Sequence, residues 1–192
     1  MAKPPRLKLR AHDATDMDVV ASVLQDALVP LTEATFVRRD RRFVMVLNRF
    51  MWERVEEAEL EAREKAVRQP SGAGSAEAGG DESGDAAFHE ADPRPTYHRT
   101  HCGVTFDKVE AVRIRGIDQA DRNQILNLLT IATEPKRIEL HFSGGGRILL
   151  EVAAVRCHLE DFDEPWPTWS LPGHQEGRGG PAGDLDGAKP AG

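Results

Sequence analysis

The chain has 192 residues, which is enough for one folded domain with extra segments, and 40% of them are hydrophobic. Its formal net charge of −7 comes from residues 53–96, where nine Glu and three Asp outnumber four Arg and one Lys. Because the rest of the chain is balanced, the sequence excludes a bulk electrostatic attraction to nucleic acid or to a membrane surface.

The sequence contains two cysteines, Cys102 and Cys157. It has no signal peptide, no lipidation motif and no apolar run approaching the roughly 18 residues of a membrane span. We therefore expect a cytoplasmic protein that does not enter membranes. One disulfide is possible by count, but two free, buried thiols are expected in a reducing compartment.

Two stretches, residues 69–96 and 171–192, consist mainly of Gly, Pro, Ala, Ser and acidic residues. Such a composition buries too little apolar surface to offset the entropy of ordering. We predict a single domain over residues 1–170, interrupted by a disordered acidic insert at about 54–96, and a disordered tail over residues 171–192. The first part of the insert, residues 54–68, is rich in Glu, Ala, Lys and Arg and predicts a solvent-exposed helical extension.

The chain begins with a strand and a helix. Apolar and charged residues alternate over residues 6–11, which predicts a half-buried strand. A helix over residues 13–28 should follow, because Asp13 or Thr15 can cap its start and Pro30 marks its end. Its apolar stripe comprises Val20, Val23, Leu24, Ala27 and Leu28.

The stretch over residues 42–52 is apolar on both faces when it is read with the period of two that strands impose. One face carries Phe43, Met45 and Leu47, and the other carries Val44, Val46, Phe50 and Trp52. A strand of this kind is stable in the middle of a sheet, covered on each side. It should form a hairpin with residues 31–37 across Arg38–Arg41.

The second half of the chain predicts more strands. Alternation indicates strands over residues 97–106, 109–117, 137–142 and 147–152, with Ser143–Gly146 as the turn of the last hairpin. Residues 125–133 fit either a helix or a buried strand, and we favour the strand. A closing helix over residues 153–162 is predicted from the stripe Val155, Leu159 and Phe162, after which Trp166 and Trp169 should pack back on the fold.

These elements predict an α+β fold: one curved, mainly antiparallel sheet or half-open barrel of about six to eight strands. One N-terminal helix, residues 13–28, and one C-terminal helix, residues 153–162, should pack against it. Seven strands followed by a covering helix would resemble a pleckstrin-homology-like barrel, although the early helix departs from that pattern.

Three patterns could suggest catalysis or metal binding. His98, His101 and Cys102, with Cys157 and His158, include metal-ligand types, but a strand would turn His101 away from the other two and the paired ligand spacings are missing. Cys102 has histidines beside it in sequence, but no Gly-x-Ser-x-Gly nucleophile motif is present. The Ser143–Gly146 loop joins two strands, so it is a hairpin turn rather than a phosphate cradle. We expect no metal and no cofactor.

Basic residues suggest an anion site. Eight arginines qualify: Arg38, Arg39, Arg41, Arg42, Arg49, Arg54, Arg113 and Arg115. The four at the hairpin tip could bind a phosphate or nucleic acid through bidentate contacts. The acidic insert and the lack of exposed aromatics among the basic residues disfavour nucleic acid, and the alternative is a solvated turn that blunts edge pairing.

Polar residues follow the apolar strand: Asn48, Arg49, Trp52 and Glu53. They could form a buried hydrogen-bond network, with Arg49 or Arg113 pairing Asp118 or Glu53. They could instead line a groove for a partner or ligand, since Trp and Arg are frequent anchors. The candidate binding residues are Arg41, Arg42, Asn48, Arg49, Trp52, Glu53, Arg113 and Asp118.

Short blocks along the chain resemble a known family. They are Leu24-Gln25-Asp26, Arg41-Arg42-Phe43, Asn48-Arg49-Phe50, Trp52-Glu53, the spacing Phe106-x-x-Val109-x-x-Val112-Arg113, Gly116-Ile117-Asp118, Gly144-Gly145-Gly146, Leu150-Glu151-Val152 and Pro165-Trp166. Together they resemble the bacterial domain-of-unknown-function 2948 family over about residues 6–170. The long acidic segment and the Gly-rich tail depart from the family pattern, which implies that neither is needed for its core role. The resemblance implies kinship and assigns no activity.

The sequence alone favours a non-catalytic interaction or small-ligand-binding module, with a protein or a small molecule as its partner. The alternative is an anionic-ligand or nucleic-acid binder that uses the Arg38–Arg42 hairpin. A third hypothesis is an enzyme whose catalytic groups lie far apart in the sequence.

Overall fold

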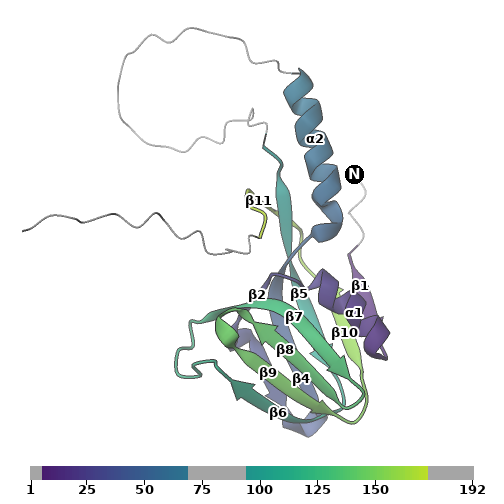
Figure 1. Ribbon diagram of the computed structural model, residues 1–192, viewed down its shortest axis with the longest axis vertical. Helices are drawn as coiled ribbons and strands as arrows, with labels where there is room; N and C mark the ends of the chain where they lie inside the picture. The colour runs from purple at the N-terminus through teal and green to yellow at the C-terminus, as the bar shows by residue number, and fades with distance from the viewer. Residues whose placement is uncertain (1–5, 69–93, 173–192) are drawn as a thin grey trace, which may run out of the picture.

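The computed structural model describes residues 6–68 and 94–172 and shows eleven strands in one sheet, with two α-helices (Figure 1). The elements of the first half are β1 (Lys8–Ala11), α1 (Ala14–Val23), β2 (Ala27–Pro30), β3 (Ala34–Val37), β4 (Arg42–Phe50) and α2 (Val55–Arg68). Those of the second half are β5 (Tyr97–Phe106), β6 (Val109–Arg115), β7 (Ile125–Glu134), β8 (Arg137–Phe142), β9 (Arg147–Val152), β10 (Cys157–Asp161) and β11 (Trp166–Thr168). Short 3-10 turns are η1 (Leu31–Glu33), η2 (Arg38–Asp40), η3 (Trp52–Arg54) and η4 (Ser143–Gly145).

The sheet is antiparallel at every strand pair in the described ranges. Its order is β1-β10-β5-β4-β2-β7-β8-β9-β6, with β11 pairing β5 and β3 pairing β4. The predicted mainly antiparallel sheet is confirmed. It is open rather than closed into a barrel, and it has more strands than predicted.

The sheet folds over on itself around one core. Figure 1 shows β6, β7, β8 and β9 in front of β4 and β5. Alternate side chains of both halves belong to the same buried cluster, among them Met45, Leu47, Val104, Leu140 and Leu150. Burying this apolar surface is the main favourable contribution to folding.

The predicted helix over residues 13–28 is wrong in its second half. Asp13 does cap α1, since its side chain accepts the Asp16 N–H at 2.9 Å. The helix ends at Val23, Asp26 adopts a left-handed φ of 59°, and the chain continues as β2. Pairing with both β4 and β7 satisfies the backbone of β2, and this outweighs the helical pattern of its side chains.

The predicted helix over residues 153–162 is wrong, because this segment contains β10. Cys157, Leu159 and Asp161 are buried, and the two residues between them are exposed, which is the period of a strand. β10 lies between β1 and β5 and pairs with both. The hydrogen bonds that two neighbouring strands offer decide the conformation here.

The other predicted strands are confirmed, including the strand favoured over residues 125–133 and the hairpin of β8 and β9. The strand predicted over residues 31–37 is shorter than predicted, because residues 31–33 form the 3-10 turn η1. β4 lies inside the sheet, with β5 on one side and β2 and β3 on the other. Its core face is buried, but Val44 and Val46 on the outward face are only half-buried. The expected cover on both sides is therefore partial.

Helix α2 projects away from the folded sheet (Figure 1). A small cluster holds its first half, in which Ala58 packs with Phe50 of β4 and Tyr97 of β5. The helical extension predicted over residues 54–68 is confirmed as α2, so this part of the predicted insert is helical rather than disordered. The rest of the insert, residues 69–93, and the tail from 173 onwards lie outside the described residues. Among the helices of the described part, none has both the length and the apolar character needed to cross a membrane.

Candidate functional site

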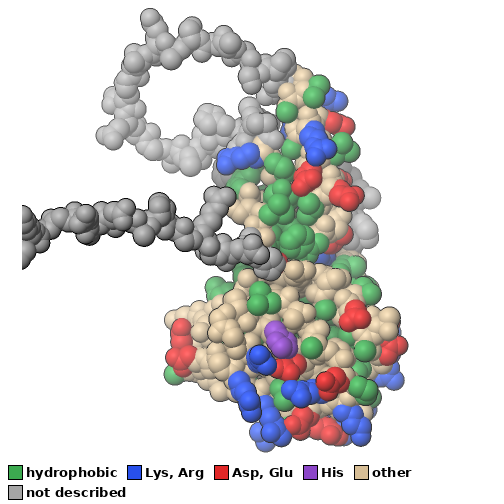
Figure 2. All heavy atoms as spheres, in the orientation of Figure 1, with side chains coloured by type: hydrophobic (Ala, Val, Ile, Leu, Met, Phe, Trp, Pro, Cys, Tyr) green, Lys and Arg blue, Asp and Glu red, His purple; other side chains and the backbone are tan. Residues whose placement is uncertain are grey.

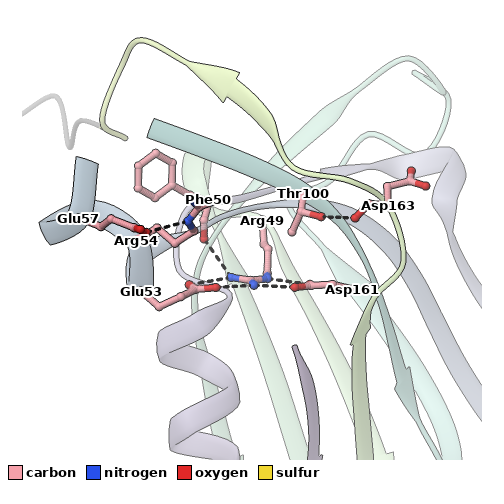
Figure 3. A network of polar contacts seen from close by, with 8 residues as sticks. All are labelled: Arg49, Phe50, Glu53, Arg54, Glu57, Thr100, Asp161 and Asp163. Carbon is pink, nitrogen blue, oxygen red and sulfur yellow. Dashed lines mark hydrogen bonds and ion pairs between the residues drawn. The ribbon is translucent and has the colours of Figure 1, made fainter. Parts of the chain in front are cut away.

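Arg49 lies on the core face near the end of β4 and makes two bidentate ion pairs (Figure 3). Its Nε and Nη2 donate to the two carboxylate oxygens of Asp161 on β10, at 2.8 and 2.7 Å. Its Nη1 and Nη2 donate to Glu53 in η3, at 3.0 and 2.7 Å. The Arg49 side chain is 0% exposed and that of Asp161 is 5% exposed.

This network joins three segments of the fold. Burial alone would lower the pKa of Arg49, but hydrogen bonds and charges from Asp161 and Glu53 raise it above its ordinary value. With a further contact from Nη1 to the Phe50 carbonyl, all five guanidinium N–H groups are directed at acceptors. Arg49 therefore has no donor left for a ligand, which favours the structural interpretation of this residue.

A second group of contacts ties η3 to the turn after α1 and ties β5 to β4. The Trp52 Nε1–H donates to the Gln25 carbonyl at 3.0 Å. The Arg99 guanidinium lies 5.6 Å from the centre of the Phe50 ring, and its Nη1 is 3.3 Å from the Asn48 carbonyl. Trp52 thus holds a loop in place, as its half-buried position indicates.

The remaining candidate binding residues lie apart from Arg49. At the hairpin, Arg41 pairs with Glu110 and Arg42 with Asp107, each at 2.7 Å. Arg113 pairs with Glu151 at 2.8 Å, and Asp118 accepts the Ala120 N–H at 2.9 Å. Figure 2 shows basic and acidic side chains intermixed over the lower end of the sheet, where β6 lies. The structure therefore brings Arg49 and Glu53 together but does not gather the eight candidates into one site.

Sequence reasoning missed a hollow on the outward face of β1, β10 and β5, which we name the outer groove. Its volume is about 760 Å³, and its lining includes Lys8, Arg10, Gly103, Thr105, His158, Glu160 and Phe162. Gly103 leaves space over this face of the sheet because it has no side chain, and the nearest atoms to a Cβ placed there, the Glu160 carbonyl oxygen and the Phe162 ring, are 3.9 Å away. The alternation of β1 was visible in the sequence, but the wrong helix over residues 153–162 hid the strand beside it.

Aromatic residues lie beside the outer groove. The His101 ring stacks on Phe162, with centroids 6.0 Å apart, and lies 4.6 Å from the Trp166 ring. Its Nδ1 is 2.6 Å from a carboxylate oxygen of Asp163. Trp166 is half-buried, as the predicted packing of this segment requires, whereas Trp169 is 50% exposed.

The cysteines do not form a reactive site. Cys102 and Cys157 are free and buried, as predicted. Burial raises the pKa of both thiols, that of Cys157 to about 12, so both stay protonated at neutral pH. Within residues 6–68 and 94–172, no cluster of three or more His, Cys, Asp or Glu side chains could hold a metal ion.

One protein family matches this chain. Neither the curated proteins nor the solved structures yield a significant match. The model of one family, described as "Protein of unknown function (DUF2948)", matches residues 7–72 and 85–174. These ranges include every described strand and both helices, so the chain belongs to the DUF2948 family.

Proposed function

We propose that this protein is a non-catalytic binding module that holds a protein or small-molecule partner in the outer groove. The observation that carries the proposal is the hollow of about 760 Å³ over Gly103, because its size is that of ligand sites in general. Its lining offers a ring from Phe162, a hydroxyl from Thr105 and cations from Lys8 and Arg10. Such a mixture of apolar and polar groups can both bind and orient a partner.

The paired state of the other candidates also supports the outer groove. Arg49 and Glu53 are engaged with each other, and Arg49 is inaccessible. At the hairpin, Arg41 and Arg42 already have carboxylate partners. A ligand at either place would have to compete with these ion pairs. In the groove, Lys8 is paired with Glu160, but Arg10 has no carboxylate partner within the described residues.

A non-catalytic role agrees with the state of the thiols. Cys102 and Cys157 are buried and protonated at neutral pH, so neither supplies a thiolate nucleophile. The groove lining itself contains one imidazole, one carboxylate and one hydroxyl, and Glu160 is held by Lys8 at 2.7 Å. In this arrangement the imidazole, the hydroxyl and the paired carboxylate can form hydrogen bonds to a bound partner.

An anion site at the Arg38–Arg42 hairpin is the second candidate. Arg39 is exposed and Arg38 lies 5.9 Å from the Phe36 ring centre, so these two arginines could still reach a phosphate. The ion pairs of Arg41 and Arg42 make this the weaker candidate.

The test fills the groove without disturbing its backbone. A Cβ at position 103 would lie 3.9 Å from its nearest neighbours, so Gly103→Leu should fold and occupy the hollow. A library of small acids, amines and short peptides is screened by the rise in melting temperature of the wild type. We expect some ligands to raise the melting temperature of the wild type. The same ligands should raise that of the control variant Arg38→Gln/Arg39→Gln but should not raise that of Gly103→Leu.

Two outcomes would contradict the proposal. If Gly103→Leu responds to every ligand as the wild type does, the groove is not the binding site. If the hairpin variant loses the response and Gly103→Leu keeps it, the second candidate is correct.

A further inference from the structure

We propose that the outer groove takes its partner at its rim: an extended peptide segment of alternating acidic and apolar residues adds a strand to the free edge of β1, with its acidic side chains on the face of Lys8 and Arg10. This inference rests on the proposed function and names its partner. Peptide addition to a sheet edge combines backbone hydrogen bonds with side-chain contacts on alternate residues.

One edge of β1 is free for pairing. β1 ends the strand order, and within the described residues its one pairing partner is β10 (Figure 1). The Asp161 N–H donates to the Leu7 carbonyl at 3.0 Å, so Leu7 is one of the residues of this edge whose backbone groups face β10. Because antiparallel ladders alternate, Leu9 also bonds to β10, and Lys8 and Arg10 turn their N–H and C=O groups away from it.

The free edge has a defined length. Beyond Arg10, the backbone N–H of His12 is already taken by the Asp16 carboxylate at 2.9 Å, where α1 begins. The backbone groups of Lys8 and Arg10 therefore form the pairing site. A partner needs only a short extended segment to occupy it.

The charges on the outward face of β1 favour acidic residues in the partner. Lys8 and Arg10 are exposed, and His158 of β10 lies opposite Arg10 in the ladder. Glu160 is engaged with Lys8, and Arg10 has no carboxylate partner within the described part of the chain. On an added strand, residues directly opposite Lys8 and Arg10 would share their face, and acidic residues there would form favourable cross-strand pairs.

The other face of β1 is apolar and incompletely covered. Leu7 and Leu9 pack against the core but are only half-buried. The alternate residues of an added strand would face the same side, so apolar residues there would complete the cover of these leucines. This gives the alternation of acidic and apolar residues.

A second copy of the chain fits the edge poorly. Two β1 strands pairing antiparallel about their centres would set Lys8 and Arg10 of one copy opposite Arg10 and Lys8 of the other. Like charges directly opposite each other destabilise a sheet. The same cations protect the edge from self-association, which is a common use of charges on edge strands.

The test uses a fluorescent probe peptide, Thr-Glu-Val-Glu-Val-Glu-Thr, and measures its fluorescence polarisation with the full chain. We expect saturable binding to the wild type and an affinity lower by about tenfold or more for Arg10→Glu. A second probe, in which Lys replaces each Glu, should bind Arg10→Glu more tightly than it binds the wild type, by a similar factor. The melting temperature of Arg10→Glu should stay close to that of the wild type, because Arg10 is exposed.

Three results would overturn strand addition. They are no binding of the Glu probe, equal binding of two probes that carry Pro or Ala at the central Glu, and full competition by single-stranded DNA of equal charge. The Pro and Ala probes carry the same charge, but only Pro removes the backbone N–H that the central position directs at β1, so the pair separates strand addition from plain attraction. If the Glu probe fails while other ligands still lose binding to Gly103→Leu, strand addition is wrong and the binding module stands.

Discussion

Arg49 and Asp161 are 112 positions apart in the chain, and their side chains meet in the interior of the fold. Taking such charges out of water is costly, and the bidentate geometry with two carboxylates offsets that cost. The pairing of Arg49 with Glu53 was one of the predicted alternatives. Asp161 was not predicted, since residues 153–162 were expected to form a helix.

Removing the Arg49 charge should destabilise the protein strongly. Arg49→Met leaves the buried Asp161 carboxylate without its partner, so we expect the free energy of unfolding to fall by about 3–5 kcal/mol. Arg49→Lys should also destabilise, because one ammonium group cannot replace two bidentate contacts. Urea denaturation measures both effects.

The matched control is Arg113→Met. Arg113 and Glu151 form an ion pair with both side chains exposed, at 64% and 41%, and this substitution should cost no more than about 1 kcal/mol. Equal losses for Arg49→Met and Arg113→Met would contradict a structural role of the buried network.

His98 should make stability depend on pH. Burial, together with the charge of Arg54, lowers the pKa of His98 below its ordinary value of 6.5. The unfolded state therefore binds more protons in the window just below pH 6.5, so stability is complete above that value and falls as the pH drops through the window. His98→Gln should lose less stability than the wild type between pH 7.5 and pH 5.5, as followed by urea denaturation. Identical losses would show that His98 does not contribute.

At the scale of elements, hairpins and alternating strands were predictable, and two helix assignments were wrong. The apolar residues of 24–28 and of 155–162 fit a helical spacing. Val155, Cys157 and Leu159 also alternate as in a strand, and the short apolar run Ala27–Pro30 is compatible with either conformation. For β2 and β10 the neighbours decide: β2 lies between β4 and β7, and β10 lies between β1 and β5. A local pattern carries no information about such neighbours, which come from distant parts of the chain.

The connection between β6 and β7 gives a prediction at this scale. Gly116 has a left-handed φ of 65°, and a Cβ there would lie 2.8 Å from the Gly145 carbonyl oxygen in the turn between β8 and β9. Gly116→Ala should therefore cost more than the roughly 1–2 kcal/mol of the left-handed conformation alone. Thermal unfolding of Gly144→Ala is the control, since φ is 72° there but nothing lies within 4 Å. A Gly116 variant no less stable than the Gly144 variant would refute the close contact.

At the scale of the whole molecule, the acidic insert is predicted to interrupt a single domain without being part of its fold. The family match omits residues 73–84, which lie within the predicted insert. Disorder of residues 69–93 stays a prediction, because these residues lie outside the described ranges. The composition of the segment, with few apolar residues, remains the argument for it.

Deleting residues 73–84 should leave the fold intact. We expect the melting temperature to change by less than about 2 °C, because the remaining residues still connect α2 to β5 and the core is untouched. Truncation after Asp163, which removes β11 and its pairing with β5, is the control and should lower the melting temperature. A deletion variant as unstable as the truncation would show that the insert is part of the fold.

The sequence by itself determined the family, most of the strands, the capped first helix and the free, buried thiols. These features depend on nearby residues or on composition, which can be read along the chain. Only the tertiary structure decided that β2 and β10 are strands, that Arg49 is saturated by Glu53 and Asp161, and that β1, β10 and β5 form the outer groove. The physical reason is that each of these features comes from hydrogen bonds or contacts between segments far apart in sequence, whose pairing no local pattern specifies.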